Sequence, residues 1–160
     1  MLQPYIEEYL KSLAGHISKA EGTDGETAAS RGIGSSYDVG YNYKQYGDSP
    51  LSTLTIKDLL ALQDENEDFA AGRFQVKPQT LLENFGRAGL TEDSLFDEDG
   101  QDEVFKRLLR GRGLDKFLAG ELTEEEFAYN LSKEWASLPK DADGDSYYGH
   151  DGLNKSNADW

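Results

Sequence analysis

The chain contains no cysteine, which excludes disulfide bonds and thiolate metal sites. Its two histidines, His16 and His150, would need carboxylate ligands beside them to hold zinc. We therefore expect neither a metal ion nor a cofactor. His16 lies within a helical pattern of apolar residues, where a surface or partly packed position is expected.

Basic side chains and long apolar runs are also scarce. Sixteen lysine and arginine residues stand against 31 aspartate and glutamate residues, which gives a net charge of −15. Such a surface repels phosphate backbones and anionic lipid, so we expect no nucleic acid and no membrane among its partners. No apolar run approaches the ~20 residues of a membrane span, and no secretory signal follows Met1.

The composition nevertheless favours a folded domain. Of the 160 residues, 11% are aromatic, including nine tyrosines. Acidic disordered chains lack aromatic residues at that level, and a chain of this size buries about 68–70% of its unfolded surface. We expect a single domain over residues 1–160 that is a monomer.

Apolar residues near the N-terminus recur every three or four positions, the spacing of a helix with one buried face. They are Leu2, Tyr5, Ile6, Tyr9, Leu10, Leu13, Ile17 and Ala20. The spacing predicts a helix over residues 3–20, and Gly22 is a suitable stop. Glu21 is then expected at or just past the end of a core helix.

The next region, residues 22–50, is rich in Gly, Ser, Thr, Tyr and Asp and has no helical periodicity. It predicts an irregular lobe with one or two short strands, around residues 36–43. A helical lobe over about 52–139 and a polar C-terminal loop over 140–160 are expected to follow. The fold class that these regions predict is α+β and mostly helical.

Local signals mark the helices of the helical lobe. Thr55 and Pro78 are typical of helix starts, and Thr123 with Glu126 is typical of a capping box. Trp135 continues the apolar spacing of the last helix, which predicts a core position, and Pro139 ends that helix.

Two features suggest chemistry. Glu21 would line a cleft between the two lobes, where apolar neighbours could keep its carboxyl protonated as a general acid. A glutamate after a helix is more often a solvated surface residue. Downstream, Ala71-Gly72-Arg73-Phe74-Gln75 forms a small-residue turn, in which Gln75 offers a donor and an acceptor to a sugar. The alternative is an ordinary turn before a helix, with Phe74 in the core.

Four motifs together resemble the phage lambda lysozyme family, in its order and at roughly its spacing. They are Ala20-Glu21-Gly22-Thr23-Asp24, Tyr37-Asp38-Val39, Ala71-Gly72-Arg73-Phe74-Gln75 and Trp135-Ala136-Ser137-Leu138-Pro139. The resemblance runs from about residue 5 to 155. The Gly-Arg-Phe-Gln turn is also similar to the Gly-Leu-Met-Gln motif of soluble lytic transglycosylases. Phe74 replaces the Tyr that the lambda family has in this turn.

The resemblance implies a lysozyme-like fold and an endolysin that acts on peptidoglycan in the bacterial cell wall. Glu21 falls on the catalytic glutamate and is expected to cleave the β-1,4 bond between N-acetylmuramic acid and N-acetylglucosamine. In the lytic transglycosylase route this glutamate works alone and forms a 1,6-anhydro sugar. In the hydrolytic alternative a second carboxylate lies about 5–9.5 Å away. Asp24, Glu26 and Asp38 are candidates, and Asp38 is favoured because it lies in a matched motif.

Side chains with aromatic faces or polar groups are expected to bind the glycan. They are Tyr37, Arg73, Phe74, Gln75, Tyr147 and Tyr148. For Tyr147 and Tyr148, a packed C-terminal flap is an equally good interpretation.

A non-enzymatic calcium- or glycan-binding module is the alternative from a different class. Asp141, Asp143 and Asp145 resemble the first half of a calcium loop, but Gly152 stands where the bidentate carboxylate belongs. For the enzyme, the missing secretory signal leads us to expect delivery by a holin, by injection, by fusion to a longer protein or by a larger phage assembly.

Overall fold

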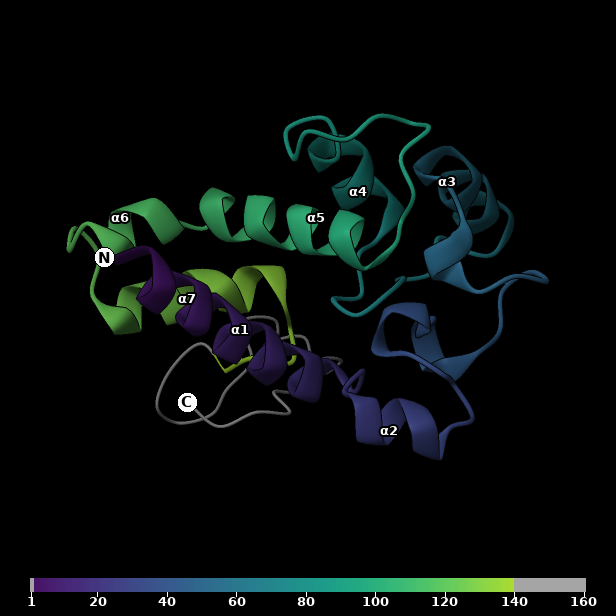
Figure 1. Ribbon diagram of the computed structural model, residues 1–160, viewed down its shortest axis with the longest axis horizontal. Helices are drawn as coiled ribbons and strands as arrows, with labels where there is room; N and C mark the ends of the chain where they lie inside the picture. Colours follow the sequence, from purple (N-terminus) through teal and green to yellow (C-terminus); the bar gives the residue numbers. More distant parts are fainter. Residues whose placement is uncertain (1, 140–160) are drawn as a thin grey trace.

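The computed structural model describes residues 2–139, and its fold is mostly helical, as the sequence predicts (Figure 1). In chain order the elements are α1 (Leu2–Glu21), α2 (Gly25–Ser30), the 3-10 helices η1 (Ser36–Asp38), η2 (Tyr41–Tyr43) and η3 (Leu51–Thr53), then α3 (Ile56–Glu65), α4 (Pro78–Asn84), α5 (Glu98–Gly111), α6 (Leu114–Leu118) and α7 (Glu124–Glu134). None of the described helices is both long and apolar enough to cross a membrane.

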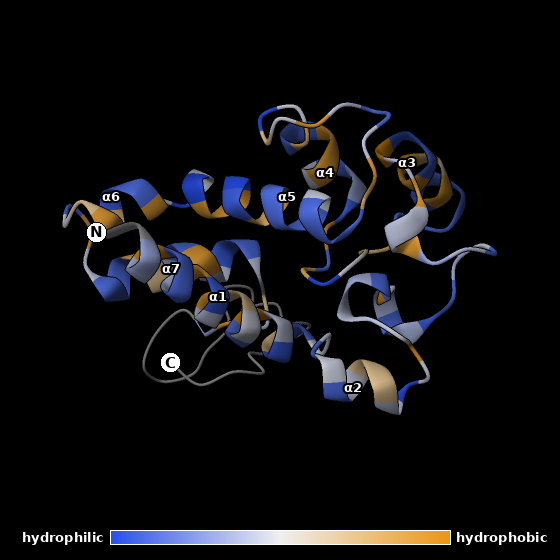
Figure 2. Cartoon of the chain, in the orientation of Figure 1, coloured by the Kyte–Doolittle hydropathy of each residue, from blue (hydrophilic) through white to orange (hydrophobic). Residues whose placement is uncertain are grey.

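The elements form two groups that the long helix α5 connects (Figure 1). Helices α1, α6 and α7 lie along α5 at one end, and α2, α3 and α4 lie at the other. Buried apolar residues of these helices form most of the core, and Figure 2 marks apolar residues in orange among hydrophilic ones in blue. His16 is exposed on α1, as expected from its place in the helical pattern.

Helix α1 ends where the sequence predicts, because Gly22 takes a left-handed conformation with φ +76°. The amide of Thr23 donates to the carbonyl of Ser18 at 2.8 Å, and the amide of Gly22 donates to that of Lys19 at 3.1 Å. This backbone pattern is typical of a glycine helix terminus. It leaves Glu21 as the last residue of the helix.

The short strands predicted around residues 36–43 do not form. That segment holds η1 and η2 instead, because Ser35 caps η1 and both Asn42 and Tyr43 have positive φ. Among the described residues, β structure is limited to isolated bridges, one of which joins Gly40 to Ala71. The bridge attaches the irregular lobe to the turn that precedes α4.

Helix starts agree with the local signals. Thr55 caps α3, Pro78 opens α4, and Thr123 with Glu126 forms the capping box of α7. Helix α5 begins at Glu98 behind the cap Asp97, earlier than its apolar residues indicate. Trp135 is buried against the Phe105 ring of α5, as predicted, and Phe105 stacks on Phe74 with ring centroids 4.1 Å apart.

Gln101 is a buried polar residue on α5, with an exposed fraction of 2%. Its amide nitrogen donates to the carbonyls of Tyr37 and Phe96, each at 2.9 Å, and its amide oxygen accepts from the Arg73 amide at 2.9 Å. One side chain therefore joins α5 to the irregular lobe and to the turn at residue 73.

Replacing this amide should weaken the whole fold. We expect Gln101→Met to lower the free energy of unfolding by about 2–4 kcal/mol, because three buried backbone groups lose their partner. Denaturant unfolding followed by tryptophan fluorescence measures the loss. The control Gln79→Met removes an exposed amide that bonds to Glu83, and the loss should stay below about 0.5 kcal/mol. Equal losses in both variants would contradict the role of Gln101.

Candidate active site

Glu21 lies at the C-terminal end of α1 and is mostly enclosed rather than solvated. Burial raises the pKa of its carboxyl to about 7, and a hydrogen bond from Ser137 acts in the opposite direction. The Ser137 hydroxyl donates to Oε1 of Glu21 at 2.9 Å. A carboxyl in this environment keeps its proton close to neutral pH, which is the property that a general acid needs.

The end of α1 is bonded to the turn at residues 72–75. The Thr23 hydroxyl donates to the carbonyl of Arg73, and the Ser18 hydroxyl lies 2.9 Å from the same Thr23 oxygen. Both Thr23 and Ser18 are buried. The position of Glu21 is thus fixed relative to the 72–75 turn by groups on either side of it in the sequence.

The 72–75 turn is a tight hairpin closed by backbone bonds between Ala71 and Val76 of 2.9 and 3.0 Å. Gly72 has φ +82°, and a side chain there would collide with the Gln101 amide. Gln75 also has a positive φ of 51°, and its amide nitrogen donates to the carbonyls of Val39 and Gly72. Both amide hydrogens of the Gln75 side chain therefore bond to backbone carbonyls of the protein.

Phe74 occupies the core, with an exposed fraction of 1%. Its carbonyl accepts a hydrogen bond of 2.9 Å from Nε1 of Trp135. We expected a sugar contact from the Phe74 ring, but the burial of the ring corresponds to the alternative of a core residue before a helix.

Tyr37 and Arg73 form a small network with Asp102 of α5. The Tyr37 hydroxyl donates to Oδ1 of Asp102 at 2.8 Å and accepts from the Arg73 guanidinium at 3.1 Å. Burial and the hydrogen bond to Asp102 raise the pKa of Tyr37 to about 12. Tyr37 is a buried support for Arg73, rather than the open sugar platform that the sequence led us to expect.

Two of the candidate second carboxylates accept hydrogen bonds from other groups of the chain. Oδ1 of Asp38 accepts from the Ser52 amide at 2.8 Å, and Asp24 caps α2 through the hydroxyl and amide of Thr27. The Thr27 hydroxyl is the main cause of the lowered pKa of Asp24. Glu26 is exposed on the first turn of α2. The hydrogen bonds and ion pairs of residues 2–139 connect none of the three to Glu21.

Sequence reasoning missed the contact that Tyr43 makes next to Glu21. Its hydroxyl donates to the carbonyl of Gly22 at 3.1 Å, and the Arg31 guanidinium lies 4.6 Å from the centre of its ring. It also missed Gln101 and Asp102, which are polar residues in an amphipathic helix and carry no local signal. Ser137 lies within a quoted motif, but its contact with Glu21 spans 116 positions.

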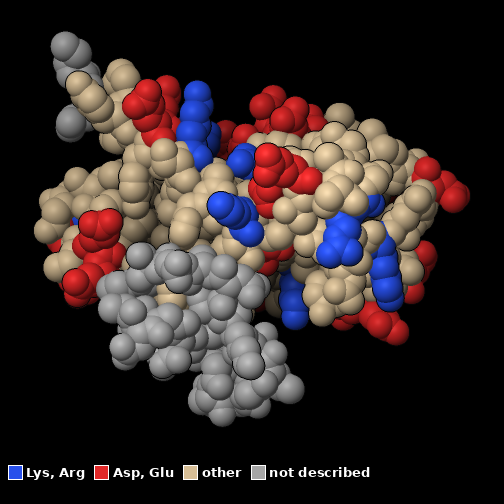
Figure 3. Space-filling view, turned by 90° about the horizontal axis from the view of Figure 1, so that it is seen from below, with Lys and Arg blue, Asp and Glu red and all other residues tan. Residues whose placement is uncertain are grey.

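The remaining predictions concern the C-terminal residues, a metal site and the surface charge. Tyr147, Tyr148 and the Asp141–Asp145 stretch are outside the described residues. Within residues 2–139, no group of three His, Cys, Asp or Glu side chains could hold a metal ion. On the face in Figure 3, basic side chains are scattered among acidic ones rather than gathered in one patch.

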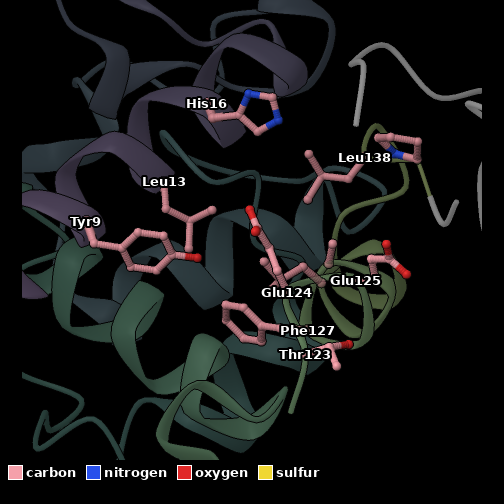
Figure 4. Close-up of a pocket in the computed structure, with 11 residues that line it drawn as sticks. Tyr9, Leu13, His16, Thr123, Glu124, Glu125, Phe127 and Leu138 are labelled. Atoms are coloured by element: carbon pink, nitrogen blue, oxygen red, sulfur yellow. The ribbon is translucent and has the colours of Figure 1, made fainter. Parts of the chain in front are cut away.

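A cavity of about 660 Å³ lies between α1 and α7 and does not include Glu21. Figure 4 shows apolar side chains in its wall, with His16, Glu124 and Glu125 also lining it.

Comparison with known protein families, curated proteins and solved structures found no match for this chain.

Because Glu21 is buried, removing its charge should stabilise the fold, and the size of this gain should depend on pH. The raised pKa means that stability is lost as pH rises from the ordinary value of 4.5 to about 7, and the loss then stays constant. The free energy of unfolding of Glu21→Gln should therefore be about 3 kcal/mol higher than that of wild type at pH 8. At pH 4 the two free energies of unfolding should be nearly equal. Thermal unfolding at both pH values tests this. A gain of the same size at pH 4 would show that ionisation is not its cause.

Proposed function

We propose that the protein is a peptidoglycan muramidase that cleaves the β-1,4 bond between N-acetylmuramic acid and N-acetylglucosamine. One observation carries the proposal: among the carboxyls of the described residues, Glu21 has the most strongly perturbed pKa, and it lies where three of the four motifs meet. Ser137 bonds to its side chain, Thr23 bonds to the 72–75 turn, and Trp135 bonds to the same turn. The resemblance to phage lambda lysozymes supplies the substrate class.

In the first step, protonated Glu21 donates its proton to the glycosidic oxygen as that bond breaks and positive charge develops at C1 of the muramyl sugar. The proton is available near neutral pH because burial disfavours the charged carboxylate. The leaving N-acetylglucosamine end keeps the proton on its new hydroxyl.

In the second step, the same carboxylate takes the proton of the muramyl C6 hydroxyl, and that oxygen bonds to C1. The product is a 1,6-anhydro sugar, Glu21 is protonated again, and no water is consumed. Asp24 caps α2, and Asp38 accepts a hydrogen bond from the Ser52 amide. These bonds support the one-carboxylate route, because a hydrolytic partner must be positioned to hold a water.

The proposed site of action is the bacterial cell wall, and the proposed partner is the glycan strand. A net charge of −15 repels an anionic wall at long range, so added salt should accelerate association by screening that repulsion.

Loss of the Glu21 acid should nearly abolish cell-wall lysis. We expect Glu21→Gln to lower the rate on purified peptidoglycan by about 10²–10⁴-fold, the usual contribution of a general acid. The matched control is Glu8→Gln, an exposed position on the same helix, which should lyse at the wild-type rate. Wild-type lysis by Glu21→Gln would remove Glu21 from the mechanism.

The two routes differ in their products. Mass spectrometry of muropeptides should show ends that are one water lighter than hydrolysed ends, and Asp38→Asn should keep the wild-type rate within about threefold. Asparagine keeps an oxygen that accepts from the Ser52 amide, so a large loss would report chemistry rather than folding. Hydrated ends together with an inactive Asp38→Asn would replace the one-carboxylate route by hydrolysis.

A further inference from the structure

The segment that follows α7 places one hydroxyl against Glu21. Ser137 has an exposed fraction of 7%, and its Oγ lies 2.9 Å from Oε1 of Glu21. The segment is held on both sides of this serine. Nε1 of Trp135 bonds to the Phe74 carbonyl at 2.9 Å, and the Leu138 amide donates to the Trp135 carbonyl at 3.0 Å. Leu138 is itself buried, so the position of Ser137 is fixed by its neighbours.

A serine hydroxyl suits a carboxyl that changes its charge. It can donate its proton to an ionised carboxylate or accept one from a neutral carboxylic acid. A hydrogen bond to an ionised group is about twice as strong as one between neutral groups. The Ser137 hydroxyl therefore favours the ionised form of Glu21, against the effect of burial.

We propose that Ser137 is a positioning residue, which holds the Glu21 carboxyl in one orientation and stabilises its ionised form between the two proton transfers. This inference rests on the proposed function, in which Glu21 first gives and then retakes a proton. Ser137 acts through Glu21, and no contact of Ser137 with the glycan is needed.

The groups around Glu21 determine how strongly Ser137 can affect its pKa. Burial and the Ser137 hydroxyl are the causes of its altered pKa, and burial is the larger of the two. Several titratable or charged groups belong to the segments that hold Glu21 and Ser137, and these groups have other partners or lie in solvent. They are exposed Lys19 on α1, Asp24 as the cap of α2, Tyr43 on η2, Arg73 in the turn, and Glu134 on α7. Removing the hydroxyl leaves burial unopposed and should raise the pKa of Glu21 further.

The experiment measures Glu21 directly and the reaction separately. The carboxyl carbon of Glu21 is titrated by NMR in isotope-labelled protein, with Glu21→Gln used to assign its signal. The rate on purified peptidoglycan is measured from pH 4 to 9. For Ser137→Ala we expect a higher Glu21 pKa, a matching upward movement of the alkaline limb of the rate profile, and a kcat lower by about 10- to 100-fold, with KM unchanged.

Ser132→Ala is the matched control. Ser132 is a buried serine in α7, and its hydroxyl bonds at 2.6 Å to the Tyr129 carbonyl of its own helix. Its loss should leave the titration of Glu21 and the pH profile at wild-type values. Ser137→Thr keeps a hydroxyl and should restore the wild-type pKa. If Ser137→Ala does not fold, Ser137→Cys keeps the size with a weaker donor and should move the pKa in the same upward direction.

The outcomes separate this inference from the proposed function. An unchanged Glu21 pKa and kcat in Ser137→Ala would overturn the positioning role while lysis by wild type continues. An equal change in Ser132→Ala would assign the effect to general loosening and would also overturn it. If wild type does not cleave peptidoglycan, the proposed function fails, and the positioning role in that reaction fails with it. The substrate-free titration would still report whether Ser137 sets the acidity of Glu21.

Discussion

The backbone of the turn between Ala71 and Val76 is buried, and each of its polar groups needs a partner. Those partners come from separate parts of the chain: Thr23 after α1, Val39 in the irregular lobe, Gln101 on α5 and Trp135 after α7. Because the polar groups of this one turn bond to four segments, the turn fixes those segments relative to one another. Glu21 is two residues before Thr23 and Ser137 two residues after Trp135, so their contact follows from the same constraint.

The raised pKa of Glu21 and the negative charge of the surface have separate causes. The chain carries 31 acidic side chains, yet the raised pKa of Glu21 comes from burial and not from neighbouring carboxylates. Exposed charges are screened over about 10 Å at ordinary salt, whereas a desolvated carboxyl is not relieved by salt. In the proposed reaction, the surface charge can therefore influence encounter with the wall without changing the protonation of Glu21.

Local signals predicted the helices well because caps and glycine stops act within a few residues. Thr55, Pro78 and Thr123 begin helices, and Gly22 ends the one that carries Glu21. The strands predicted around 36–43 failed because Asn42 and Tyr43 take positive φ, which tertiary contacts such as the Tyr43–Gly22 bond support. The Ser137–Glu21 contact could not be predicted by local reasoning, since it joins residues 116 positions apart.

The motifs that suggested sugar binding turn out to hold many of the contacts that support the acid. Phe74 packs in the core, Tyr37 supports Arg73, and both amide hydrogens of Gln75 bond to backbone. A glycan bound at the proposed site could thus not contact the whole set of motif side chains. For this reason the four motifs are a stronger guide to the position of Glu21 than to the residues that would bind a sugar in the proposed reaction.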